Sequence, residues 1–212
     1  MARLMDLGLD RLRNMILDMA ELSSNTVNVA IDSYVQGLDL RERVYGWSEE
    51  LRMLQDEVSE LAVELLARYQ PVASDLRFIK SCMEVAYGFS RLGRYAHDIT
   101  DVLGVFGDLS KCDKSEIERA GKQAEDMIRL SIKAFTERDV KLASTVKEMD
   151  DLVDNAYVSY VKRAAHDEMG ADHKCTLSAT LILRYVERIA DHATYIGDTV
   201  LYIVTGERTP RK

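Results

Sequence analysis

The chain has 212 residues, of which 47% are hydrophobic and 30% charged, and its formal net charge is -8 at pH 7. This composition favours a soluble, mostly helical protein of one large domain or two small ones. It argues against a general nucleic-acid binder, which needs a basic surface. No stretch approaches the roughly 18 to 20 uninterrupted apolar residues of a membrane span, and acids interrupt the apolar pattern at the N-terminus, so no signal peptide is predicted.

The three cysteines predict a reducing compartment. Cys82, Cys112 and Cys175 are far apart and odd in number. We therefore expect each to be a reduced thiol that fills space as a small apolar side chain, in a cytoplasmic protein.

Three helices are predicted in the first half of the chain. They cover roughly residues 4–36, roughly 40–69, and from Pro71 to about Val105, each with apolar residues at spacings of three and four. Pro71 is expected to stop the second helix and to suit the first turn of the third. Residues 104–114, with two glycines and several polar residues, are the most loop-like region.

Three more helices are predicted in the second half. The fourth starts near Ser115, where Ser115 and Glu118 have the spacing of a capping box. Asp139 can cap the fifth, residues 166–173 form the next break, and Gly206 closes the sixth. The pattern predicts six helices and no strand.

The two halves resemble each other. The stretch RLGRYA (residues 91–96) lies 97 residues before RIADHA (residues 188–193), and Ile99 and Asp101 match Ile196 and Asp198 at the same offset. We interpret this as a duplicated three-helix unit. The predicted fold is therefore all-α, with two tandem three-helix bundles at residues 1–107 and 108–212.

The sixth predicted helix carries an acidic face. Glu187, Asp191 and Asp198 recur at spacings of four and seven, so they share one side of the helix, nearly opposite its apolar seam. Such carboxylates can face a metal ion, a basic partner, or only water.

Two stretches resemble the PhoU family of phosphate-uptake regulators. They are LLARYQPVASDLR (residues 65–77) and RYVERIADHATYIGDTVLYIVTGE (residues 184–207), the second with an E-x-x-x-D signature at Glu187 and Asp191. The resemblance covers essentially the whole chain and implies an all-α fold of two three-helix bundles. It also implies a cytoplasmic protein that damps phosphate uptake and phosphate-starvation signalling. Such a protein binds the ATPase of a phosphate ABC transporter and, where present, a sensor histidine kinase, and it often forms homodimers.

The resemblance further implies a surface cluster of iron or zinc held by E/D-x-x-x-D pairs. The second half supplies two such pairs, Asp150 with Asp154 and Glu187 with Asp191, and residues four apart point the same way on a helix. We expect both pairs to lie off the core, open to water. His192 and Asp198 lie near these pairs in the sequence and are further candidates, either as metal ligands or as residues that orient the ligands.

The first half departs from the family pattern. Ser90 and Arg94 stand where the family has carboxylates, and Arg52 falls where Asp154 falls in the second half. Because arginines repel a cation, we expect the first half to have lost its metal site. Arg52 and Arg94 are expected to pair with Asp56, Asp98 or Asp101, or to hold an anion.

Alternatives remain open at this point. The paired acids could be only solvated, which leaves a helical adaptor without metal, or the chain could be a metal-binding or storage protein without a transporter partner. A di-iron enzyme of ferritin type needs Glu-x-x-His pairs, which the chain lacks, and no other constellation typical of an enzyme occurs. The isolated histidines, His97, His166 and His173, are expected to be surface or capping residues.

Overall fold

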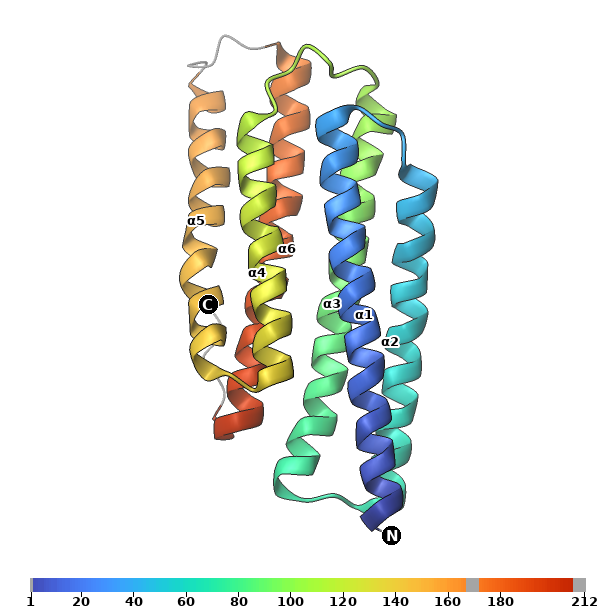
Figure 1. Ribbon diagram of the computed structural model, residues 1–212. Helices are drawn as coiled ribbons and strands as arrows, with labels where there is room; N and C mark the ends of the chain where they lie inside the picture. Colours follow the sequence, from blue (N-terminus) through green and yellow to red (C-terminus); the bar gives the residue numbers. More distant parts are fainter. Residues whose placement is uncertain (1, 167–171, 208–212) are drawn as a thin grey trace.

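The fold is a pair of antiparallel three-helix bundles. The computed structural model describes residues 2–166 and 172–207, and within these ranges it contains six helices and no strand. They are α1 (Ala2–Gln36), α2 (Arg41–Tyr69), α3 (Ala73–Phe106), α4 (Ser115–Glu137), α5 (Val140–Ala165) and α6 (His173–Thr205). Figure 1 shows α1 to α3 as one bundle and α4 to α6 as a second beside it. The predicted fold class is confirmed, and the boundary between residues 107 and 108 stays a prediction.

The helix ends follow local sequence signals in part. Asp139 caps α5 because its side chain accepts two backbone N–H groups of the first turn, and Gly206 ends α6 with φ of 79°. The predicted capping box does not form, because Ser115 is already helical and donates its N–H to Asp113 Oδ1 at 2.9 Å. Pro71 follows α2 as predicted but lies outside α3 rather than in its first turn.

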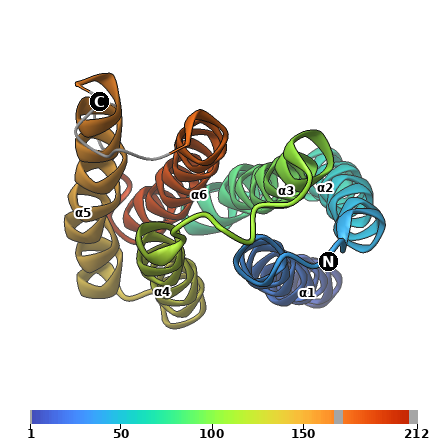
Figure 2. The same cartoon turned by 90° about the horizontal axis from the view of Figure 1, so that it is seen from above.

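The two bundles share one continuous core. α3 and α6 each pack against both other helices of their own bundle and against each other, and α1 also packs against α4. Figure 2 shows α3 and α6 adjacent in the centre of the molecule. Tyr34 of α1 donates a buried hydrogen bond to Ser178 of α6 at 3.2 Å. Among the helices so described, none has the length together with the hydropathy of a membrane-spanning segment.

The linker between the bundles is fixed to α6 by a disulfide bond. Cys112 in the linker is bonded to Cys175 in the first turn of α6, 63 residues away. Lys174 Nζ also donates to the backbone oxygen of Asp108 in the linker, at 2.8 Å. The prediction of three reduced thiols is therefore wrong for this pair, because the linker runs past the start of α6. Cys82 is a free, buried thiol, as predicted.

Candidate metal centre

Four acidic residues lie on α5 and α6, which pack against each other, and three of them converge. Asp150 and Asp154 lie one helical turn apart on α5, and Glu187 and Asp191 lie one turn apart on α6. Asp150, Asp154 and Asp191 each place an oxygen so that the three atoms lie within 4.8 Å of one another. The structure thus brings together three of the predicted ligands across two helices. Such a set of oxygen atoms suits iron, manganese or magnesium, and zinc also accepts carboxylates.

The carboxylates are less open to water than predicted. Asp150 is only 6% exposed, and the side chain of Glu187 is 12% exposed. Asp150 lies on the same side of α5 as Val146 and Val153, which are both buried against the core. Thr194 of α6 donates a hydrogen bond to Asp150 Oδ1 at 3.2 Å. The prediction that both pairs lie off the core is therefore wrong for Asp150, which faces α6.

Two arginines of α6 bind the acids of the same helix. Arg184 Nη1 lies 2.6 Å from Glu187 Oε1, and Arg188 Nη1 lies 3.2 Å from Asp191 Oδ2. Burial and the neighbouring carboxylate of Asp191 nevertheless raise the pKa of Glu187, with a further contribution from Asp154. Glu187 Oε2 is buried, and within the described ranges it has no hydrogen-bond partner, although Arg188 Nε lies 3.8 Å away. A buried oxygen in this setting fits a site for a cation.

Two other predicted residues of the centre lie outside this group. Among the described residues, the group of converging oxygen atoms does not include Asp198. The ring of His192 instead faces α3, with centroids 5.9 Å from Tyr87 and 5.7 Å from Tyr95. Burial, helped by Arg91 and Arg188, lowers the pKa of His192 to about 4, so the imidazole is neutral at pH 7. The structure thus places His192 at the contact between the bundles.

The matching positions of the first bundle carry arginines that are bound to acids. Arg52 donates to Glu49 at 3.2 Å and to Asp56 at 3.4 Å, and Arg94 donates to Asp98 at 3.2 Å. The predicted pairing of both arginines with neighbouring acids is confirmed. These ion pairs are exposed and contribute little to stability.

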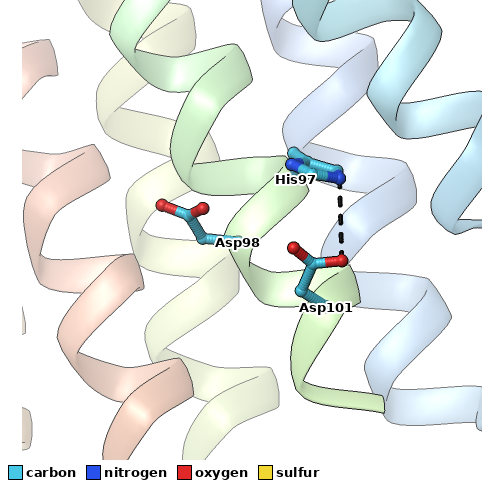
Figure 3. Close-up of side chains that lie close together, drawn as sticks. All are labelled: His97, Asp98 and Asp101. Atoms are coloured by element: carbon cyan, nitrogen blue, oxygen red, sulfur yellow. Dashed lines mark ion pairs between the residues drawn. The ribbon is translucent and has the colours of Figure 1, made fainter. Parts of the chain in front are cut away.

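A second group of potential ligands, which sequence analysis missed, lies on α3. His97, Asp98 and Asp101 place one donor atom each within 4.8 Å of the others. In Figure 3 a dashed line joins His97 to Asp101, at 3.6 Å, whereas Asp98 points away from His97. The spacing H-D-x-x-D could have revealed this group. Because Asp98 is already bound to Arg94 and all three residues come from one helix, we treat the group as surface ion pairs.

Comparison with known families matches the PhoU domain to residues 16–103 and again to residues 117–200. A protein of Synechocystis sp. named phosphate-specific transport system accessory protein PhoU homolog is 31% identical, over 95% of this chain and 91% of the relative. A protein of the same name from Pseudomonas aeruginosa is 28% identical, over 93% of this chain and 84% of the relative.

Solved structures show the same architecture. The crystal structure of PhoU from Pseudomonas aeruginosa matches with a TM-score of 0.87 and 28% identity, over 95% of this chain and 99% of that one. The phosphate transport system regulatory protein PhoU from Streptococcus pneumoniae matches with a TM-score of 0.88, over 98% of this chain and all of that one. At 21% identity, the second likeness supports the fold alone.

Proposed function

This chain belongs to the PhoU family, and we propose that it is an accessory regulator of a phosphate-specific transport system. One observation carries the proposal: relatives named as accessory proteins of that system align with 93% or more of this chain. The PhoU domain also matches in both halves of the chain, so the likeness extends beyond one motif.

The mode of action that we propose is binding rather than catalysis. The regulator lowers phosphate uptake and phosphate-starvation signalling from the cytoplasmic side. It does so by contacting the ATPase subunit of the transporter and, in hosts that have one, a sensor histidine kinase. Large apolar side chains on the surface support contact with a partner, for example Leu177 at 58% and Leu181 at 41% exposure on α6. The same surfaces could pair two copies of the chain as a homodimer.

A gene deletion tests the regulatory role. Cells without the gene should take up more phosphate in phosphate-rich medium than the parent strain, and the intact gene should restore the lower rate. The purified chain should also bind the purified ATPase subunit in a direct binding assay. Unchanged uptake together with no binding to the ATPase would overturn the proposal.

We also propose that Asp150, Asp154, Glu187 and Asp191 form a metal centre of the second repeat, with Asp198 two helical turns beyond Asp191 on α6. Bound iron or zinc, as one ion or as a cluster, would link α5 to α6 through carboxylate oxygens. It would thereby fix the relative position of the two helices on the surface that a partner meets. The short distances between the oxygens of Asp150, Asp154 and Asp191 support this assignment.

Elemental analysis of tag-free protein tests the centre. The parent protein should carry iron, zinc or manganese in stoichiometric amount, and the Glu187→Ala, Asp191→Ala double variant should lose it. A matched control changes Glu60→Ala and Glu64→Ala, an exposed pair with the same spacing on α2, and should keep the metal. Metal that remains in the first variant would place the site elsewhere.

A metal-binding or storage protein without a transporter partner is the second candidate, and the carboxylate group on α5 and α6 favours it. The same deletion strain separates the two functions. If the chain is a storage protein, the deletion strain should take up phosphate at the parental rate and should contain less metal than the parent strain.

A further inference from the structure

Each carboxylate that α6 contributes to the candidate centre is bound by an arginine three residues before it. Arg184 binds Glu187 and Arg188 binds Asp191, so the same arrangement occurs twice within eight residues. Arg188 also approaches Glu187, with 3.8 Å between Nε and Oε2. The guanidinium of Arg184 lies over the ring of Tyr157 on α5, 5.4 Å from its centroid. The cations therefore lie at the same junction of helices as the acids.

We propose that Arg184 and Arg188 are built-in counter-charges of the centre, which a metal ion displaces when it binds. The inference rests on the metal centre proposed above and goes beyond it, because it assigns a second state to these two arginines. In the state without metal, the arginines neutralise Glu187 and Asp191. In the metal-bound state, the carboxylates of Glu187 and Asp191 bind the metal ion, and the guanidinium groups of the two arginines turn to solvent.

Competition for the same oxygen atoms is the physical reason. Oε1 of Glu187 and Oδ2 of Asp191 are already bound by guanidinium groups, so an ion that uses both oxygens of either carboxylate must break an ion pair. A metal ion and a guanidinium also repel each other at these short distances.

The first repeat shows where such an arginine goes when no carboxylate is present. Arg91 lies 97 residues before Arg188, in a repeat that has Ser90 and Arg94 at the acidic positions. The guanidinium of Arg91 lies over the ring of Tyr95 and donates to its hydroxyl oxygen at 2.6 Å. An arginine at this helix position can therefore bind a group other than the acids of the centre, although His192 stands in the second repeat where Tyr95 stands in the first.

The consequence is a surface whose charge depends on metal. Arg184 and Arg188 are 37% and 43% exposed in their paired state, so release would present both to solvent without rearrangement of the helices. The exposed Leu181 lies one turn before Arg184 on α6. A partner with carboxylate or phosphate groups would meet two additional free guanidinium groups only when the centre is loaded.

Two measurements with zinc, which is diamagnetic, test the displacement. In NMR spectra, the Nε–Hε signals of Arg184 and Arg188 should shift on titration with zinc, while the signal of Arg94 stays unchanged. In calorimetry at low salt, Arg184→Gln and Arg188→Gln should each bind zinc roughly tenfold more tightly than the parent, because a competing cation is gone. Arg68→Gln, which removes the exposed partner of Glu64 on α2, is the matched control and should bind like the parent.

The outcomes separate this inference from the metal centre itself. If zinc binds and Asp191→Ala abolishes binding, but the arginine signals stay in place and the glutamine variants bind more weakly, the arginines position the ligands and the inference is wrong. If the parent neither binds zinc nor carries iron or manganese on elemental analysis, the metal centre fails and the inference fails with it. The NMR titration uses the unaltered protein, so a variant that fails to fold does not remove the test.

Discussion

Glu125 shows how a single carboxylate can weaken the contact between the two repeats. It lies on α4, in a groove of about 380 Å³ that α1 and α4 form together. Burial raises the pKa of Glu125, and the nearby Asp32 and Asp126 raise it further. The folded protein therefore binds the proton of this group more tightly than the unfolded chain does. The stability that this proton contributes is present at low pH and is lost as the pH rises through the folded pKa.

We predict that Glu125→Gln stabilises the protein at pH 7, by up to about 1 kcal/mol. The amide keeps the shape of the side chain and removes a charge that burial and two acids disfavour. The gain in the free energy of unfolding should shrink when urea unfolding is repeated near pH 4. Glu57→Gln, at an exposed position of α2, is the control and should change little. A loss of stability in Glu125→Gln at pH 7 would contradict the argument.

At the scale of elements, glycine sets how closely the helices of the two repeats approach. Gly121 of α4 faces α1, and a Cβ atom at this position would lie 2.9 Å from Cγ2 of Ile31. Ile31 is almost fully buried, and its branched side chain has little freedom to move. The contact between α1 and α4 therefore depends on the missing side chain.

Gly121→Ala should destabilise the protein by about 1 kcal/mol net, because overpacking outweighs the better helix propensity of alanine. Gly46→Ala is the matched control, since among the described residues no atom beyond its chain neighbours and the adjacent backbone of α2 lies within 4 Å of a Cβ built there. That variant should gain up to about 1 kcal/mol from propensity alone. Thermal unfolding of the two variants measures the difference, and equal shifts for both would show that the close approach is unimportant.

The helices were predictable because local sequence decides them. Apolar residues at spacings of three and four placed all six, and Asp139 and Gly206 marked ends that the structure confirms. The predicted capping box of Ser115 and Glu118 was wrong because Asp113, two residues before Ser115, accepts the N–H of Ser115. Which of several neighbouring polar residues accepts a backbone N–H at the start of α4 depends on the path of the linker. The local sequence pattern does not determine that path.

The candidate centre was predictable in composition but not in environment. Spacing of four residues placed Asp150 beside Asp154 and Glu187 beside Asp191, whichever way the helices turn. The burial of Asp150 depends on how α5 is rotated against α6, and that rotation comes from packing across the whole repeat. By contrast, the arginine pairs could have been read from the sequence, since three residues separate each arginine from its acid.

At the scale of the whole molecule, the two repeats share a fold but differ in chemistry. Acids converge between α5 and α6, whereas arginines bound to nearby acids occupy the matching positions of the first repeat. The linker between the repeats is also held covalently, by the disulfide bond between Cys112 and Cys175. That pairing was beyond sequence analysis, because 63 residues separate the two cysteines and only the assembled bundles bring them together.

Loss of this bond should lower the free energy of unfolding by up to about 4 kcal/mol, the chain-entropy value for a loop of this length. Urea unfolding with and without reductant measures the effect in the parent protein. The Cys112→Ser, Cys175→Ser double variant should match the reduced parent and should not respond to reductant. A midpoint that reductant leaves unchanged in the parent would contradict the prediction.

The disulfide also changes the path that a mechanical load takes through the chain. It closes a covalent ring that contains all of α4 and α5, whereas α6 begins at the point of closure. A force applied to the two ends of the protein passes from the linker straight into α6. The two helices inside the ring then carry no tension. Stretching the oxidised chain should release about 200 Å less length than stretching the reduced chain, since each enclosed residue contributes about 3.3 Å or slightly more.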